Sequence, residues 1–130
     1  MKFTVGSNPI TIRTLGRIYL SGNSGTHTVK LVNANTGLDV ANGSVAISMV
    51  GGTAGQFKFA PLPTPVVLPA NNSYYLVSQE LIGGDTWASQ NTRVTTTSAA
   101  VCNGSILNSG SGWTFKNPAN TTYGPVSFTY

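Results

Sequence analysis

The sequence predicts an all-β protein: a β-sandwich with an antiparallel jelly-roll or related Greek-key topology. Apolar residues recur at every second position in most segments, which is the period of a half-buried strand. No segment shows the three-and-four spacing, with a cap and a stop, that marks an amphipathic helix. Glycine, proline and asparagine interrupt the chain about every eight to twelve residues, as they do between the short strands of a sandwich.

Length and composition indicate one secreted module. The 130 residues suffice to bury a hydrophobic core without disulfides, so we expect residues 1–130 to form a single domain. Charged residues make up only 8% of the chain, so hydroxyl and amide side chains must supply solubility, as in extracellular β-proteins. We therefore expect a secreted or extracellular location, with the module excised from a larger protein.

Charge and cysteine content argue against several partners. The net charge is +4, but the basic residues are scattered, whereas nucleic-acid-binding proteins gather them into a patch. No stretch is long and apolar enough to cross a bilayer. Cys102 is the only cysteine, which excludes an internal disulfide and a site of several thiolates. We expect neither nucleic acid nor membrane as a partner, and Cys102 as a small buried residue.

The first expected strands are residues 3–5 and 10–20. Pro9 ends the first strand because it lacks an amide donor and restricts the residue before it. Gly16 lies in the middle of the second strand, where we expect a bulge or bend that re-aims the residues after it. Alternation gives the second strand two faces: Ile10, Ile12, Ile18 and Leu20 on one, and Arg13, Leu15, Arg17 and Tyr19 on the other.

The next expected strands follow a loop at residues 21–25. Residues 26–32 place His27 on one face with Val29 and Leu31, so we expect His27 to be a buried structural histidine. A turn at residues 33–37 leads to alternating segments at 45–49 and 57–59.

The second half contains the best candidate for a central strand. Prolines divide residues 61–69 into short extended pieces, which suits an edge strand or a crossover. Residues 74–77 are apolar on both faces, as expected of a strand in the middle of a sandwich. Residues 93–97 and 99–107 alternate weakly, residues 108–112 form a loop, and residues 113–115 and 126–130 supply the last strands.

Four stretches carry a resemblance to a known family: residues 15–17, 22–31, 52–57, and 72–80 with 83–87. Across nearly its whole length the chain resembles bacterial extracellular β-sandwich modules, largely of unassigned function, that are attached to secreted glycoside hydrolases and large surface proteins. The resemblance implies an accessory role, namely sugar binding, beside a catalytic domain in the parent chain. It assigns no functional residues.

A glycine-rich loop that follows the expected central strand is the candidate site. Sugar binding needs an aromatic face and a few planar polar groups, and this loop supplies Trp87 close to two carboxylates and an amide. Arg17 and Tyr19, or Trp113, would add a second platform. The expected ligand-binding residues are Trp87, Asp85, Glu80, Gln79, Arg17, Tyr19 and Trp113, with a polysaccharide or oligosaccharide as ligand. The alternative is that both tryptophans are core or rim residues and that Glu80 caps a turn or pairs with Arg17.

Other chemistry fits the sequence less well. Glu80 and Asp85 are the only local carboxylate pair for glycoside hydrolysis, and Ser-His-Asp catalysis would need a base oriented by an acid, whereas His27 is expected to face the core. We therefore expect no enzyme and no cofactor. A structural calcium ion at Asp85 and Glu80 is the alternative cofactor, and a structural or adhesive spacer is the alternative function.

Overall fold

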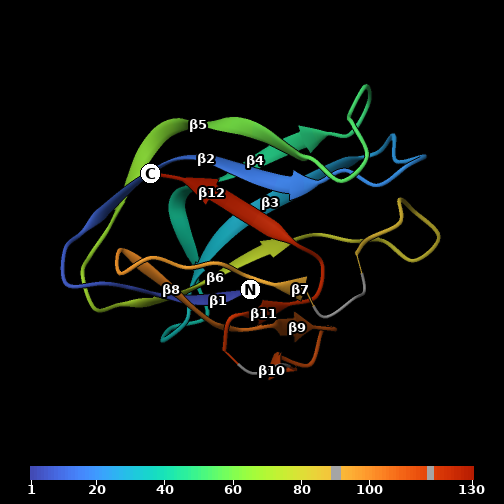
Figure 1. Cartoon of the computed structure of the whole chain (residues 1–130). Helices are drawn as coiled ribbons and strands as arrows, with labels where there is room; N and C mark the ends of the chain where they lie inside the picture. The colour runs from blue at the N-terminus through green and yellow to red at the C-terminus, as the bar shows by residue number, and fades with distance from the viewer. Residues whose placement is uncertain (89–91, 117–118) are drawn as a thin grey trace.

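The chain folds into an antiparallel β-sandwich in the computed structural model (Figure 1), which describes residues 1–88, 92–116 and 119–130. No α-helix occurs among these residues. The strands are β1 (Lys2–Val5), β2 (Ile10–Ile18), β3 (Thr26–Asn33), β4 (Asp39–Ser48), β5 (Phe57–Leu68), β6 (Ser73–Ser78), β7 (Thr92–Arg93), β8 (Ala100–Gly104), β9 (Ile106–Asn108), β10 (Trp113–Phe115), β11 (Thr121–Thr122) and β12 (Val126–Thr129). The all-β, antiparallel prediction is confirmed, while the jelly-roll connectivity stays a prediction.

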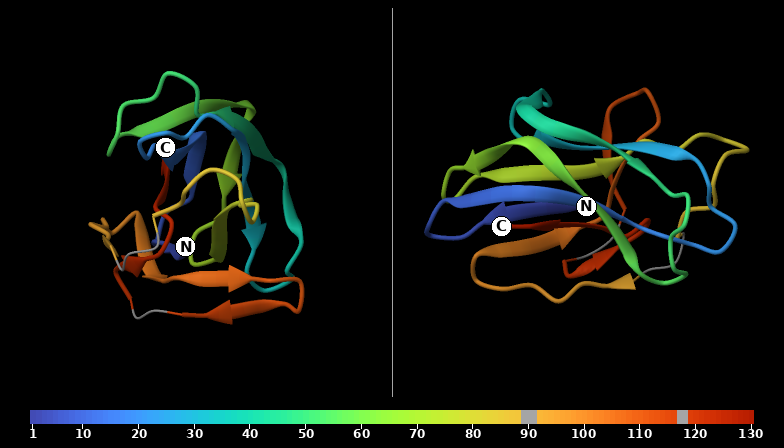
Figure 2. Two further views of the ribbon diagram at one scale, coloured as in Figure 1. Left: turned by 90° about the vertical axis from the view of Figure 1, so that its right-hand side faces the viewer. Right: turned by 90° about the horizontal axis from the view of Figure 1, so that it is seen from above.

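Two main sheets enclose the core (Figure 2). One has five strands in the order β4-β3-β6-β1-β8, and the other has three in the order β12-β2-β5. Two small sheets, β10-β9 and β11-β7, add to them. Side chains of both main sheets meet in one apolar cluster that includes Phe3, Ile12, Leu15, Leu31 and Leu76. Cys102 also belongs to this cluster, as a free buried thiol, which confirms the expectation for it.

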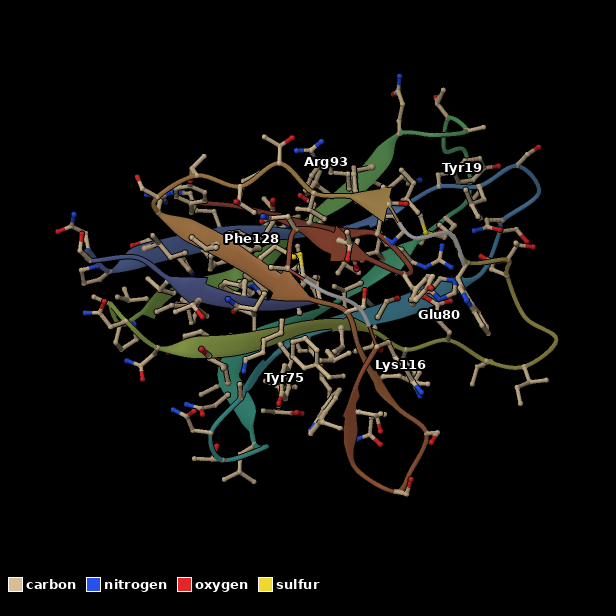
Figure 3. The ribbon with its side chains drawn as sticks, turned by 60° about the horizontal axis from the view of Figure 1, so that its bottom comes forward. Tyr19, Tyr75, Glu80, Arg93, Lys116 and Phe128 are labelled. Atoms are coloured by element: carbon tan, nitrogen blue, oxygen red, sulfur yellow. The ribbon has the colours of Figure 1, made fainter. Side chains whose placement is uncertain are left out.

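Strand β6 occupies the middle of the five-stranded sheet, between β3 and β1. Tyr74 and Leu76 face the core and are only 4% and 0% exposed. On the opposite face, Tyr75 is half-buried and lies against Trp113, with 4.7 Å between the ring centroids. Figure 3 shows Tyr75 on the side from which the β9–β10 hairpin projects. The predicted central strand, apolar on both faces, is confirmed.

Strand β2 contains the irregularity that positions the site. Its register with β5 shifts between Ile12 and Thr14, so the inward face changes from Ile12 to Leu15 and Arg17, while Arg13 stays exposed. The prediction that Arg13 shares a face with Leu15 and Arg17 is therefore wrong, because strict alternation does not hold across a register shift. The bulge was expected at Gly16. Gly16 instead pairs with Phe59, and the Phe59 ring lies 2.6 Å from the position that a Cβ on residue 16 would take.

Strand β5 forms one edge of the three-stranded sheet, paired with β2 alone among the described strands. Its prolines are tolerated there because one side of an edge strand needs no amide donors. This confirms the expectation of an edge for residues 61–69, although the strand is longer than its prolines suggested and includes residues 57–59.

Candidate functional site

A buried ion pair joins β2 to the loop that follows β6. The Arg17 side chain is 2% exposed, and its Nε and Nη2 donate to Oε1 and Oε2 of Glu80 at 2.8 Å each. Two parallel bonds of this kind are the strongest arrangement that an arginine and a carboxylate can form. Ser78 Oγ donates a further bond of 2.6 Å to Glu80 Oε1. The alternative reading of Glu80 as the ion-pair partner of Arg17 is thus confirmed.

His27 on β3 joins the same loop at two points. Its Nδ1 lies 3.0 Å from the carbonyl oxygen of Gln79 and 3.2 Å from Glu80 Oε2, and its Nε2 lies 3.0 Å from Asp85 Oδ2. The carbonyl and the carboxylates are hydrogen-bond acceptors, so a ring nitrogen that carries a proton donates to them. His27 is 7% exposed, so its predicted burial is confirmed, and its ring contacts two carboxylates that the sequence did not assign to it.

Asp85 is held by donors from three residues. The backbone amides of Ser24 and Gly25 donate to Oδ1 and Oδ2 at 3.0 and 2.8 Å, and His27 is the third donor. The Ser24 amide is the main cause that lowers the pKa of Asp85, with His27 and the Gly25 amide adding to it against the opposing effect of burial. Each of these donors favours the ionised carboxylate.

This shift makes stability depend on acid pH. A carboxyl whose pKa is lowered by folding stabilises the fold fully above its unfolded value, near 3.8, and the contribution disappears as the pH falls through the folded value. Unfolding in urea between about pH 2 and pH 7 should therefore show Asp85→Asn less stable than the original at neutral pH, with the difference shrinking below 3.8. A difference that is constant across this range would show that the charge of Asp85 does not contribute.

The carbonyl of Thr86 supplies a further fastening. This carbonyl accepts from Asn23 Nδ2 at 2.9 Å and from Arg17 Nη2 at 3.3 Å. At the start of the loop, the Gln79 amide donates to the Thr28 carbonyl at 2.9 Å. The loop of residues 79–88 is therefore attached through Gln79, Glu80, Asp85 and Thr86, and also through the Ala88 carbonyl, which accepts from the Gly124 amide. Figure 3 shows Glu80 at the end of the sandwich from which this loop extends.

The same loop also exposes apolar side chains, which lie between the residues that attach it to the sandwich. Leu81 is 67% exposed, Ile82 is fully exposed and Trp87 is 43% exposed. Gly83, with a positive φ of 78°, turns the chain between Ile82 and Asp85 in a conformation that glycine adopts without strain. The loop thus combines a buried, charged base with an exposed, apolar surface.

The structure places the predicted site residues in four different surroundings. Arg17, Glu80 and Asp85 belong to one buried network, while Trp87 and Gln79 lie on the same loop and are exposed. Tyr19 is half-buried against the core and over Gly52. Trp113 lies on the outer face of the five-stranded sheet, against Tyr75, and is not joined to this network by any described contact.

Sequence reasoning missed part of the network. Asn23 and the backbone amides of Ser24 and Gly25 were assigned only to a loop, and His27 was given no carboxylate partner. Asp85 lies 58 residues from His27 in the chain, so no local spacing signals their contact. The indirect signal is compositional: in a chain this poor in charge, each buried charged group must find a partner elsewhere.

Comparisons with family models, curated proteins and solved structures find no match for this chain. No group of three or more histidine, cysteine, aspartate or glutamate residues in the described part of the chain is placed to hold a metal ion. No described helix is long and apolar enough to cross a membrane. The function is therefore proposed from the geometry of the site.

Proposed function

We propose that this domain is a non-catalytic module that binds a neutral polysaccharide through the loop of residues 79–88, and so holds its parent protein near that polymer. The observation that carries the proposal is the exposure of Trp87 on a loop fixed by a buried ion network. An indole that is 43% exposed offers a face for the apolar side of a pyranose ring. A loop fastened before the ligand arrives loses less conformational entropy on binding.

The carboxylates act in this proposal as positioning groups. Both oxygens of Glu80 accept from Arg17, and both oxygens of Asp85 accept from backbone amides. Sugar hydroxyls would have to displace these bonds, at the cost of leaving buried charges unpaired. Hydrogen bonds to the sugar are therefore assigned to the exposed residues Gln79 and Thr86 of the same loop.

The charges of the loop favour a neutral ligand. Residues 79–88 contain no lysine or arginine, and the guanidinium of Arg17 beside them is buried and paired. An anionic polymer such as pectin would find no free cation on this loop and would meet two carboxylates. Xylan, glucan, mannan and chitin carry no such charge.

The state of Asp85 favours binding over hydrolysis. A glycoside hydrolase needs one carboxyl group that stays protonated to act as general acid, which requires a raised pKa. The pKa of Asp85 is lowered instead, chiefly by the Ser24 amide, and Glu80 is held by two bonds from Arg17. Asp85 is therefore not available as the proton donor.

The direct test is retardation in native gels that contain xylan, glucan, mannan, chitin fragments or pectin. We expect retardation by at least one neutral polymer and none by pectin. Retardation by pectin alone would contradict the neutral ligand. No retardation by any polymer would favour the structural or adhesive spacer instead.

Trp87→Ala should weaken binding to the retarding polymer by about 1–3 kcal/mol, the scale of aromatic stacking on a flat ring ligand. The far-UV circular dichroism should stay unchanged, because the indole is not part of the core. Phe59→Ala is the matched control, since Phe59 is 45% exposed and lies on strand β5 outside the loop. Equal losses in the two variants, or unfolding of Trp87→Ala, would overturn the role of Trp87.

A further inference from the structure

A hollow lies at the end of the sandwich opposite to the loop of residues 79–88. Its volume is about 350 Å³, and it is lined by residues 7–11, 98–99 and 130. Figure 1 shows the connection between β1 and β2 at the far left and the loop after β6 at the far right. Strand β2 has nine residues and runs between the two ends, so about 30 Å separate them at roughly 3.3 Å per residue.

The lining of this hollow has the chemistry that a sugar requires. Ser7, Asn8, Thr11 and Ser98 supply hydroxyl and amide groups, and none of the described residues that line the hollow has a charged side chain. Tyr130 is 53% exposed and presents an aromatic ring on the same hollow. The volume is in the lower part of the range for small-ligand sites, roughly 300–1,000 Å³, which leaves room for about one or two sugar rings.

The walls of the hollow are held in place. The hydroxyl of Tyr130 lies 3.0 Å from Thr97 Oγ1, and its ring lies 5.9 Å from that of Phe128. The Gly6 amide donates to the Ala99 carbonyl at 2.9 Å. A Cβ on Gly6 would clash with the Ser98 carbonyl oxygen, so the approach of residues 98–99 to this point depends on glycine. The Tyr130 ring and the wall formed by residues 98–99 are thus held in position before a ligand binds.

We propose that this hollow is a second glycan-binding site, which takes a neutral pyranose with Tyr130 as the stacking platform. Ser7, Asn8, Thr11 and Ser98 exchange hydrogen bonds with the sugar hydroxyls. The inference depends on the lining of this hollow and not on Trp87. Two sites about 30 Å apart on one rigid domain bind a polymer more tightly than a short oligosaccharide, because the second contact becomes intramolecular.

The experiment is a titration of the whole chain with neutral oligosaccharides from xylan, glucan, mannan and chitin. Amide chemical shifts in two-dimensional NMR spectra report which residues bind them. We expect amide shifts at residues 7, 8, 10 and 11 and at 98–99, in addition to residues 79–88. Tyr130→Ala should weaken binding at the hollow roughly tenfold, while Trp87→Ala leaves it unchanged. Tyr130→Phe keeps the ring and should lose less affinity. Tyr123→Ala, with a side chain that is 45% exposed and outside the hollow, is the matched control.

The outcomes separate the two sites. Shifts confined to residues 79–88, or an unchanged affinity at the hollow in Tyr130→Ala, overturn the second site and leave the proposed function standing. Shifts confined to the surroundings of Tyr130 support the second site and overturn the assignment of binding to Trp87. An absence of shifts with every oligosaccharide overturns both.

Discussion

Arg17→Met should lower the free energy of unfolding by about 3–5 kcal/mol, the cost of removing one partner from a buried ion pair. The substitution leaves Glu80 without the two bonds of 2.8 Å that neutralise it, and it removes a donor to the Thr86 carbonyl. Urea denaturation followed by circular dichroism measures the change. We also expect faster proteolysis within residues 79–88, because the loop loses an attachment.

Arg13→Met is the matched control for this variant. Arg13 lies on the same strand and is exposed, so its replacement should change stability by less than about 0.5 kcal/mol. The double variant Arg17→Met/Glu80→Leu should recover part of the loss, because no unpaired charge then remains. A loss below about 1 kcal/mol for Arg17→Met would contradict the buried pair, since exposed pairs contribute no more than that.

Leu76→Ala should cost about 2–5 kcal/mol, the range for leucine truncation in a packed core. Leu76 is fully buried, in the central strand of the five-stranded sheet. Its deletion leaves a cavity that strands on both sides hinder from closing. The melting temperature and the urea midpoint should both fall, without a change in the ligand-binding residues.

Leu38→Ala is the same chemical change at a position that is 69% exposed, and we expect a cost of less than about 0.5 kcal/mol. Equal costs at Leu76 and Leu38 would place β6 at the surface. That result would contradict the arrangement of the two sheets.

The fold could be predicted because its main signals are local. Period-two alternation identifies most long strands, the apolar faces of residues 74–77 identify the central one, and the prolines of residues 61–69 identify an edge. The register shift between β2 and β5 lies opposite the proline-rich residues 62–65 of β5, and the alternation of residues 10–18 does not show it. The burial of Arg17 therefore could not be read from alternation.

The site could be predicted only in part, for a related reason. The sequence concentrates polar, charged and aromatic residues in positions 79–87, and in the structure Glu80 and Asp85 join one network while Trp87 remains exposed. The sequence does not show which of these residues attach the loop to the sandwich and which remain exposed. That division is set by His27 and the amides of Ser24 and Gly25, which come from a segment about 60 residues away from Asp85.

The most direct measurement uses Trp87 as its own reporter. In Trp113→Phe, Trp87 is the only tryptophan, since the chain contains two. Titration with oligosaccharides from the retarding neutral polymer should shift its fluorescence emission to shorter wavelength and saturate, because stacking on a sugar removes water from the indole. If gel retardation persists in this variant while the emission of Trp87 stays constant to saturation, the loop of residues 79–88 is not the binding site.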